Sequence, residues 1–301
     1  MILKPVVGLL GLAVVTSWAG EVQVHHVHGV SVDPRDPAVV YVATHAGLAR
    51  LAAGRAPELV GEHRFDLMGF TAHPSVPGLV WASGHPDLPR YRREGVGNLG
   101  LLESRDGGAT WRSVALHGKA DFHALAWSPH DGGHLYGWSA AGESGFYRIS
   151  ATSSKVERLP ARGLADVNAL AASPASAGPL LAGTRQGLLV SRDRGLRWLP
   201  ATGLPAGAPV TAVAFHRDDP RVVYAFVAGA AGALFRSGDS GTAWEKTALR
   251  REAQDPVVAL AAGPGQQVVA ATASADVLSS RDGGRTWEVL LERGRSLTSA
   301  P

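Results

Sequence analysis

The stretch SRDGGATW, residues 104–111, belongs to a pattern S-x-D-x-G-x-x-W that occurs four times in this 301-residue chain. The other copies are SRDRGLRW (191–198), SGDSGTAW (237–244) and SRDGGRTW (280–287). Their aspartates are Asp106, Asp193, Asp239 and Asp282. These aspartates are separated by 87, 46 and 43 residues, and the first interval spans two units, so the chain repeats with a period of about 45 residues.

The octapeptide has the residues of a tight turn between two strands. Its aspartate can accept hydrogen bonds from backbone N–H groups of the turn, and its glycine can take a positive φ. Its tryptophan offers a large apolar surface that can pack between neighbouring units. The octapeptides are therefore predicted to be structural hairpins.

This motif resembles the Asp-box, or BNR, repeat of sialidase-like β-propellers, a group that includes proteins named as glycosyl hydrolases. Together with weaker repeats, the resemblance covers nearly all of the chain after residue 20. Related propellers include assembly factors for photosynthetic complexes and sorting-receptor domains. The resemblance implies a propeller whose Asp boxes lie on the face opposite to the starts of the inner strands.

A second repeat agrees with this fold. Six apolar segments rich in small residues precede turns, as expected for inner strands buried on both faces. They are VHGVSVDP (27–34), LMGFTAHP (67–74), FHALAWSP (122–129), VNALAASP (167–174), VTAVAFHR (210–217) and VVALAAGP (257–264). Another strand pattern follows, as in VVYVATHAG and LVWASGHPD. We predict an all-β, six-bladed β-propeller of four-stranded antiparallel blades, with seven blades as the alternative.

The two ends of the chain are predicted to lie outside the propeller. Residues 1–20 read as a signal peptide, with Lys4, an apolar run over 6–15 and a small-x-small site at 17–19. The propeller is expected over 21–296, with a tail over 297–301. We therefore expect a secreted or periplasmic protein, monomeric and without a membrane span after cleavage.

The composition excludes cysteine chemistry and argues against one class of partner. The absence of cysteine excludes disulfides and thiolate sites. The net charge is +3 and no run of basic residues would track a phosphate backbone, so nucleic acid is not an expected partner.

Propeller geometry gathers residues from distant repeats at one mouth of the channel. The second position of each inner segment is His28, Met68, His123, Asn168, Thr211 or Val258. Two residues earlier, on the same side of the strand, are His26, Asp66, Asp121 and Asp166 in four of the repeats. The following strands end at His45, His85 and Arg185 in repeats one, two and four.

This grouping predicts a transition-metal site. We expect His28, Met68, His85 and His123 as ligands, with His26, His45, Asp66 and Asp121 as further possible ligands. Imidazole and thioether together favour copper, above all Cu(I), and imidazole with carboxylate leaves zinc as the alternative. The expected role is metal handling or assembly of a metalloprotein. The histidines elsewhere are expected at the surface: His63, His73, His117, His130, His134 and His216.

Two other functions stay open. A sialidase-like glycosidase would need an arginine triad and a nucleophilic tyrosine; the first-repeat arginine is missing, and no tyrosine lies clearly at an inner-strand start. Another glycosidase chemistry could use Asp66, Asp121, Asp166 and Arg185. The second alternative is a non-catalytic scaffold that binds an envelope protein through the loop 86–98, which contains Arg90, Tyr91, Arg92 and Arg93.

Overall fold

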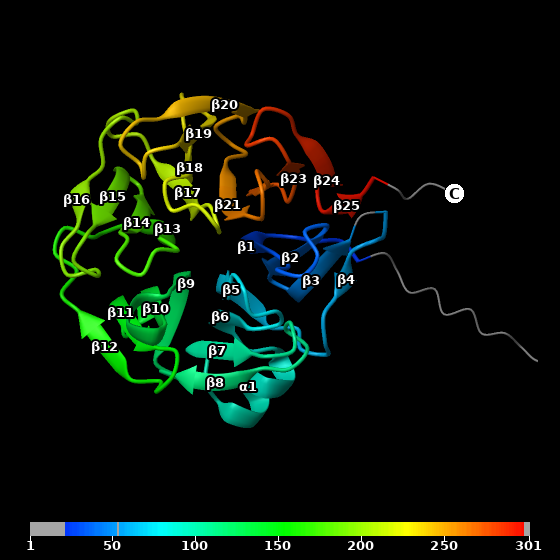
Figure 1. Ribbon diagram of the computed structural model, residues 1–301. Helices are drawn as coiled ribbons and strands as arrows, with labels where there is room; N and C mark the ends of the chain where they lie inside the picture. Colours follow the sequence, from blue (N-terminus) through cyan, green and yellow to red (C-terminus); the bar gives the residue numbers. More distant parts are fainter. Residues whose placement is uncertain (1–21, 53, 298–301) are drawn as a thin grey trace, which may run out of the picture.

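The computed structural model describes residues 22–52 and 54–297. They form six β-sheets arranged as blades around a central channel (Figure 1). The chain is thus a six-bladed β-propeller, as predicted. The predicted signal peptide and residues 298–301 of the predicted tail lie outside the described residues, so those boundaries stay predictions.

Each of the first three blades is a four-stranded antiparallel sheet. Blade 1 contains β1 (Val27–Val32), β2 (Val39–Thr44), β3 (Gly47–Ala52) and β4 (Glu58–Leu59). Blade 2 contains β5 (Asp66–Ala72), β6 (Val80–His85), β7 (Leu101–Ser104) and β8 (Arg112–Ala115). Blade 3 contains β9 (Ala120–Ser128), β10 (His134–Gly142), β11 (Gly145–Ser150) and β12 (Val156–Leu159), with the 3-10 turn η1 (His130–Gly132) between its first two strands.

Blades 4 to 6 continue the pattern, and the last blade gains a short fifth strand. Blade 4 contains β13 (Val167–Ala172), β14 (Leu180–Thr184), β15 (Gly187–Ser191) and β16 (Leu199–Pro200). Blade 5 contains β17 (Val210–Phe215), β18 (Val223–Val227), β19 (Ala233–Ser237) and β20 (Glu245–Arg250). Blade 6 contains β21 (Val257–Ala262), β22 (Val268–Thr272), β23 (Val277–Ser280), β24 (Glu288–Glu292) and β25 (Arg295–Ser296).

The first strand of every blade lies at the centre of the ring. The inner strands β1, β5, β9, β13, β17 and β21 each contact the next around the channel (Figure 1). All six coincide with the apolar segments predicted from the sequence. Their small side chains, such as Ala124, Ala212 and Ala259, let neighbouring blades approach closely at the narrow centre.

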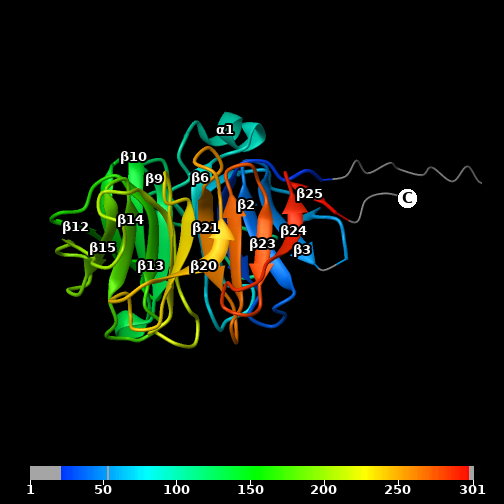
Figure 2. The ribbon, with the colours of Figure 1, turned by 90° about the horizontal axis from the view of Figure 1, so that it is seen from above.

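One short helix interrupts this pattern. α1 (Leu88–Glu94) lies between β6 and β7, in the segment predicted as a loop, and stands on one face of the ring (Figure 2). Asp87 caps its start and Gly95, with φ 70°, ends it. Within the described parts of the chain, no helix is long and apolar enough to cross a membrane.

The four octapeptides form the predicted turns between the third and fourth strands of their blades. In 280–287, Asp282 Oδ1 accepts from the backbone N–H of Thr286 at 2.9 Å, and the Ser280 hydroxyl accepts from Gly284 N–H at 2.8 Å. Gly284 has φ 94°, and the Trp287 indole donates to its carbonyl at 3.1 Å. The serine and aspartate bonds recur around Asp106, Asp193 and Asp239.

The ring closes where the first blade meets the last. Val24 N–H donates to the Gly294 carbonyl at 2.9 Å. Val24, Val27 and Val42 share one apolar core with Val269 and Ala271 of blade 6. Within residues 22–297, the segment before β1 contributes no strand to blade 6. The Gln267 side-chain amide also donates to the Pro37 carbonyl at 2.7 Å, so closure rests on this core and on these contacts between blades 1 and 6.

Two histidines predicted at the surface are buried instead. His130 is 2% exposed and its Nε2 donates to the Gly178 carbonyl at 3.1 Å. His216 is 6% exposed and its Nε2 donates to the Gly265 carbonyl at 2.7 Å. The prediction failed because each imidazole bonds the turn of the next blade, which a single-repeat comparison does not reveal.

Candidate metal site

The mouth of the channel beside α1 carries polar side chains from blades 1, 2 and 3. His28 lies near the start of β1, Asp66 begins β5, and Asp121 and His123 lie near the start of β9. His45 directly follows β2, and His85 ends β6. Strand starts and strand ends meet at this mouth because the first two strands of each blade are antiparallel.

A β-bulge lies near the start of every inner strand. In five of the six inner strands, the pairing with the second strand skips one residue near the strand start. A bulge re-aims a side chain that regular alternation would place elsewhere. The skipped residues are His28, His123, Asn168, Thr211 and Val258, and the β5 bulge spans Met68 and Gly69. His28, His123, Asn168 and Val258 line one pocket in the channel.

Three imidazoles of blade 1 stack on one another. The ring of His45 lies 4.6 Å from that of His26 and 4.6 Å from that of His28, with interplanar angles of 13° and 11°. His26 has a positive φ of 50°, which is uncommon for a residue other than glycine. This backbone turn brings His26 onto the ring of His45.

From His45, carboxylates and imidazoles alternate across blades 2 and 3. His45 Nε2 lies 3.6 Å from Asp66 Oδ1, and Asp66 Oδ2 lies 3.2 Å from His85 Nδ1. His85 Nε2 lies 3.4 Å from Asp121 Oδ2, which accepts from His123 Nε2 at 2.7 Å. Side chains from three blades therefore form one connected polar cluster.

Three members of this cluster can hold one ion together. One ligand atom each of His28, His45 and Asp66 lies within 4.8 Å of the others. Nε2 of His28 and Oδ1 of Asp66 are buried and have no hydrogen-bond partner. A buried polar atom without a hydrogen-bond partner costs about 1–3 kcal/mol, so an ion that bound both atoms would stabilise this group.

The protonation of the cluster suits metal binding. Burial and, to a smaller extent, the neighbouring His45 lower the pKa of His28 to about 4. His28 is therefore neutral at pH 7, which is the form that ligates a metal. The hydrogen bond to Asp121 raises the pKa of His123, so its Nε2 keeps the proton that it donates.

The predicted residues divide into several groups in space. His28 belongs to the three-residue group, together with His45 and Asp66, which the sequence offered only as possible ligands. His85 and His123 contact the carboxylates. Met68 is half-buried at the bulge of β5, and none of the contacts described above involves its thioether. The stacked imidazoles had no signal in the sequence beyond the spacing of the histidines.

The aspartates considered for glycoside cleavage do not face one open site. The His85 imidazole lies between Asp66 and Asp121, where the scissile bond would lie between an acid and a base. Asp166 and Arg185 line a separate cleft between blades 3 and 4.

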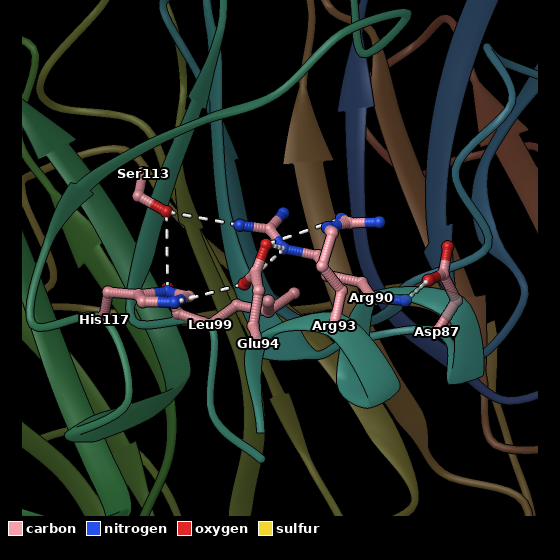
Figure 3. A network of polar contacts seen from close by, with 7 residues as sticks. All are labelled: Asp87, Arg90, Arg93, Glu94, Leu99, Ser113 and His117. Carbon is pink, nitrogen blue, oxygen red and sulfur yellow. Dashed lines mark hydrogen bonds and ion pairs between the residues drawn. The ribbon is translucent and has the colours of Figure 1, made fainter. Parts of the chain in front are cut away.

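The segment 86–98 is held beside the mouth by a polar network. Asp87 Oδ1 accepts from Arg90 N–H at 2.9 Å, and Arg90 Nε donates to Glu94 at 2.9 Å (Figure 3). His117 Nε2 lies 3.2 Å from Glu94. α1 buries none of its residues, and Leu88 and Tyr91 are 58% and 50% exposed.

Comparison with known proteins gives the fold but no family. No family model and no curated protein sequence matches the chain. Among solved structures, a GH74 xyloglucanase from Xanthomonas campestris matches with a TM-score of 0.58 and 21% identity. The match covers 89% of this chain but 46% of the enzyme, so this chain spans less than half of the enzyme's length.

Two structures of YCF48 also match. YCF48 from Cyanidioschyzon merolae has a TM-score of 0.55 and 14% identity, and the match covers 85% of this chain and 96% of that one. YCF48 bound to D1 peptide has a TM-score of 0.51 and 19% identity, with coverages of 89% and 84%. At these identities the likeness establishes the propeller fold alone.

Proposed function

We propose that this protein binds a divalent transition-metal ion at the channel mouth through His28, His45 and Asp66. The observation that carries the proposal is the pair of buried atoms without a hydrogen-bond partner, His28 Nε2 and Asp66 Oδ1, within the three-residue group. Two imidazoles and one carboxylate leave room for a further ligand from solvent or a substrate. The physiological role is metal handling or assembly of a metalloprotein.

Copper is the favoured ion and zinc the second. Nitrogen and oxygen ligands suit Cu(II) and Zn(II), and among divalent ions Cu(II) binds such sites most tightly. Thioether ligands favour Cu(I), and the Met68 thioether is not in the group, so we expect Cu(II) rather than Cu(I). His85 and Asp121 then have the supporting role, since His85 contacts both Asp66 and Asp121 and so fixes the Asp66 carboxylate.

Calorimetric titration of the metal-free protein with Cu(II) and with Zn(II) tests the proposal. His28→Ala, His45→Ala and Asp66→Asn are each expected to weaken binding at least about tenfold. His134→Ala is the matched control, because His134 begins β10, at the end of that strand opposite to the mouth. Nitrogen hyperfine structure in the Cu(II) electron paramagnetic resonance spectrum should weaken in both histidine variants. Unchanged stoichiometry and affinity in all three site variants would remove the site.

Residues 1–20 have the features of a signal peptide, and the proposed location is outside the cytoplasm. Cell fractionation followed by N-terminal sequencing tests this. A mature N-terminus near residue 20 in the exported fraction supports export, and an intact N-terminus in the cytoplasm contradicts it. The hydrogen-bond pattern of the octapeptides supports their assignment as Asp boxes.

A second candidate function is binding of an envelope protein by α1. It is favoured by the exposure of Leu88 and Tyr91 on a helix that buries no residue of its own. Arg92 and Arg93 on the same helix would attract an acidic partner. Co-purification with the wild-type protein and with a Leu88→Ser, Tyr91→Ser double variant tests it. A protein retained only by the wild type supports this candidate, and identical sets of retained proteins contradict it.

A further inference from the structure

A second cleft opens on the same face, between blades 3 and 4. Its lining includes Trp138, Ser144, Arg158, Asp166, Asn168 and Arg185. Asn168 also lines the channel pocket next to His123 and His28, so the cleft adjoins the channel. None of the three residues proposed as metal ligands lines this cleft.

Asp166 and Arg185 occupy the positions that form a side-chain contact in blades 1 and 2. The equivalent residues stack in blade 1, as His26 and His45, and form a polar contact of 3.2 Å in blade 2. In blade 4 only the main chain joins them, because Arg185 N–H donates to the Asp166 carbonyl at 3.2 Å. No ion pair between their side chains is found in the described part of the chain, so both charges can meet a ligand.

Arg158 supplies a second guanidinium, which one hydrogen bond holds at the cleft. Its Nη2 donates to the Ser144 carbonyl at 2.7 Å, in the turn between β10 and β11. Gly145 makes room for it, since a Cβ at this residue would lie 2.8 Å from Arg158 Nε. A guanidinium has five N–H donors, so one bond to Ser144 leaves others for a ligand.

These groups define the chemistry of a ligand. Two guanidinium groups against one carboxylate give the cleft a net positive charge, and guanidinium binds carboxylate with two parallel hydrogen bonds. Asp166 can accept from hydroxyl groups, and Trp138 offers an apolar ring surface. A flat, uncharged apolar molecule would leave the three charged groups without partners, and a cation would be repelled.

We propose that this cleft binds a carboxylated sugar of the hexuronate type. Arg158 and Arg185 hold its carboxylate, Asp166 accepts from its hydroxyls, and its ring lies against Trp138. The site goes beyond metal binding and does not depend on it.

Calorimetric titration with glucuronate, in the presence of a metal chelator, tests the proposal. Glucose has the same ring without the carboxylate, and acetate has the carboxylate without the ring. Glucuronate is expected to bind saturably, and the other two at least about tenfold more weakly. Because the chelator removes metal, this result is independent of the metal titration.

Arg185→Ala and Arg158→Ala are each expected to weaken glucuronate binding about tenfold or more. Arg192→Ala removes the same charge from an exposed octapeptide residue and should bind like the wild type. Arg158 and Arg185 are both exposed, so their variants should unfold at the wild-type temperature. Thermal unfolding then checks that the variants are folded. Absence of saturable glucuronate binding, equal binding of acetate, or wild-type affinity in both arginine variants would overturn the proposal.

Discussion

The side chain of Glu103 makes blade 2 unlike the other blades. Reversing its charge should lower the free energy of unfolding. Glu103 is 2% exposed on β7. Its carboxylate accepts from Trp81 Nε1 at 3.1 Å, from Arg105 Nε at 2.7 Å and from Arg112 Nη2 at 2.7 Å. Trp81 is itself 1% exposed, so this acceptor is the partner of a buried donor.

Three other blades place the opposite charges at these positions. In them a tyrosine on the second strand pairs with an arginine on the third, which pairs with a glutamate on the fourth. The sets are Tyr41, Arg50 and Glu58; Tyr136, Arg148 and Glu157; and Tyr224, Arg236 and Glu245. A phenol oxygen can accept from an arginine, whereas an indole N–H can only donate. Tryptophan in blade 2 therefore requires an acceptor at 103 and a cation at 112.

The magnitude follows from these contacts. Glu103→Arg removes the acceptor of Trp81, which costs about 1–3 kcal/mol, and places a third cation beside Arg105 and Arg112. Loss of one partner of a buried charge pair costs about 3–5 kcal/mol in all. Glu103→Gln keeps an oxygen for Trp81 and loses only bonds to exposed arginines, so we expect about 1 kcal/mol.

Urea unfolding at pH 7 measures these differences. The triple change Trp81→Tyr, Glu103→Arg and Arg112→Glu rebuilds the arrangement of the other blades and should recover most of the loss. Arg112→Glu alone is the control and should be destabilising. A triple variant no more stable than Glu103→Arg would refute the explanation.

The same carboxylate predicts a pH dependence. Burial alone would raise the pKa of Glu103, but hydrogen bonds from Arg112 and Arg105 outweigh it and lower the pKa. A lowered carboxyl pKa contributes stability that is fully present above the unfolded pKa of 4.5 and is lost as the pH falls through the folded pKa. The stability difference between wild type and Glu103→Gln should therefore be constant near neutral pH and shrink below about pH 4.5. A difference that grows on acidification would contradict this sign.

Three further outcomes are expected. Gly294→Ala should lower the unfolding temperature far more than Gly265→Ala. The two glycines have similar positive φ values, 74° and 66°, but a Cβ at Gly294 would lie 1.8 Å from the Val24 carbonyl oxygen, whereas a Cβ at Gly265 would lie in open space. Equal shifts would contradict a role of Gly294 in ring closure. Asp106→Ala should lower the unfolding temperature without changing Cu(II) affinity, because Asp106 holds a turn far from the mouth; a loss of affinity would contradict that separation. Met68→Leu should leave Cu(II) affinity unchanged, and a large loss in the same titration would assign its thioether to the site.

Much of the fold could be predicted from the sequence because the repeats report it several times. The octapeptide turns and the six inner strands recur, so an error in one unit is corrected by the others. α1 has no counterpart in other blades, and its segment was predicted as a loop despite a capping aspartate at 87 and a glycine at 95. His130 and His216 were misplaced for the same reason, since their partners lie in another blade.

The site was predictable as a neighbourhood but not as a ligand set. Alignment of the repeats places His28, His45, Asp66, His85 and His123 at one mouth of the channel. Equivalent residues of a propeller lie at the same distance from the ring axis and on the same face. Which atoms face one another depends on the bulge in each inner strand and on the positive φ of His26. The spacing of the histidines in the sequence predicts neither feature.

The bulge residues give the strongest reason to assign a function to one half of the ring. In blades 4 and 5, Asn168 and Thr211 donate to main-chain carbonyls of the next inner strand, at 3.0 and 2.6 Å. A polar bulge residue can thus tie neighbouring blades together. At the same position in blade 1, His28 keeps a buried Nε2 without a hydrogen-bond partner, in the group that it forms with His45 and Asp66. Asparagine or threonine at this position would satisfy the fold without that cost, so the imidazole of His28 supports the proposed metal site.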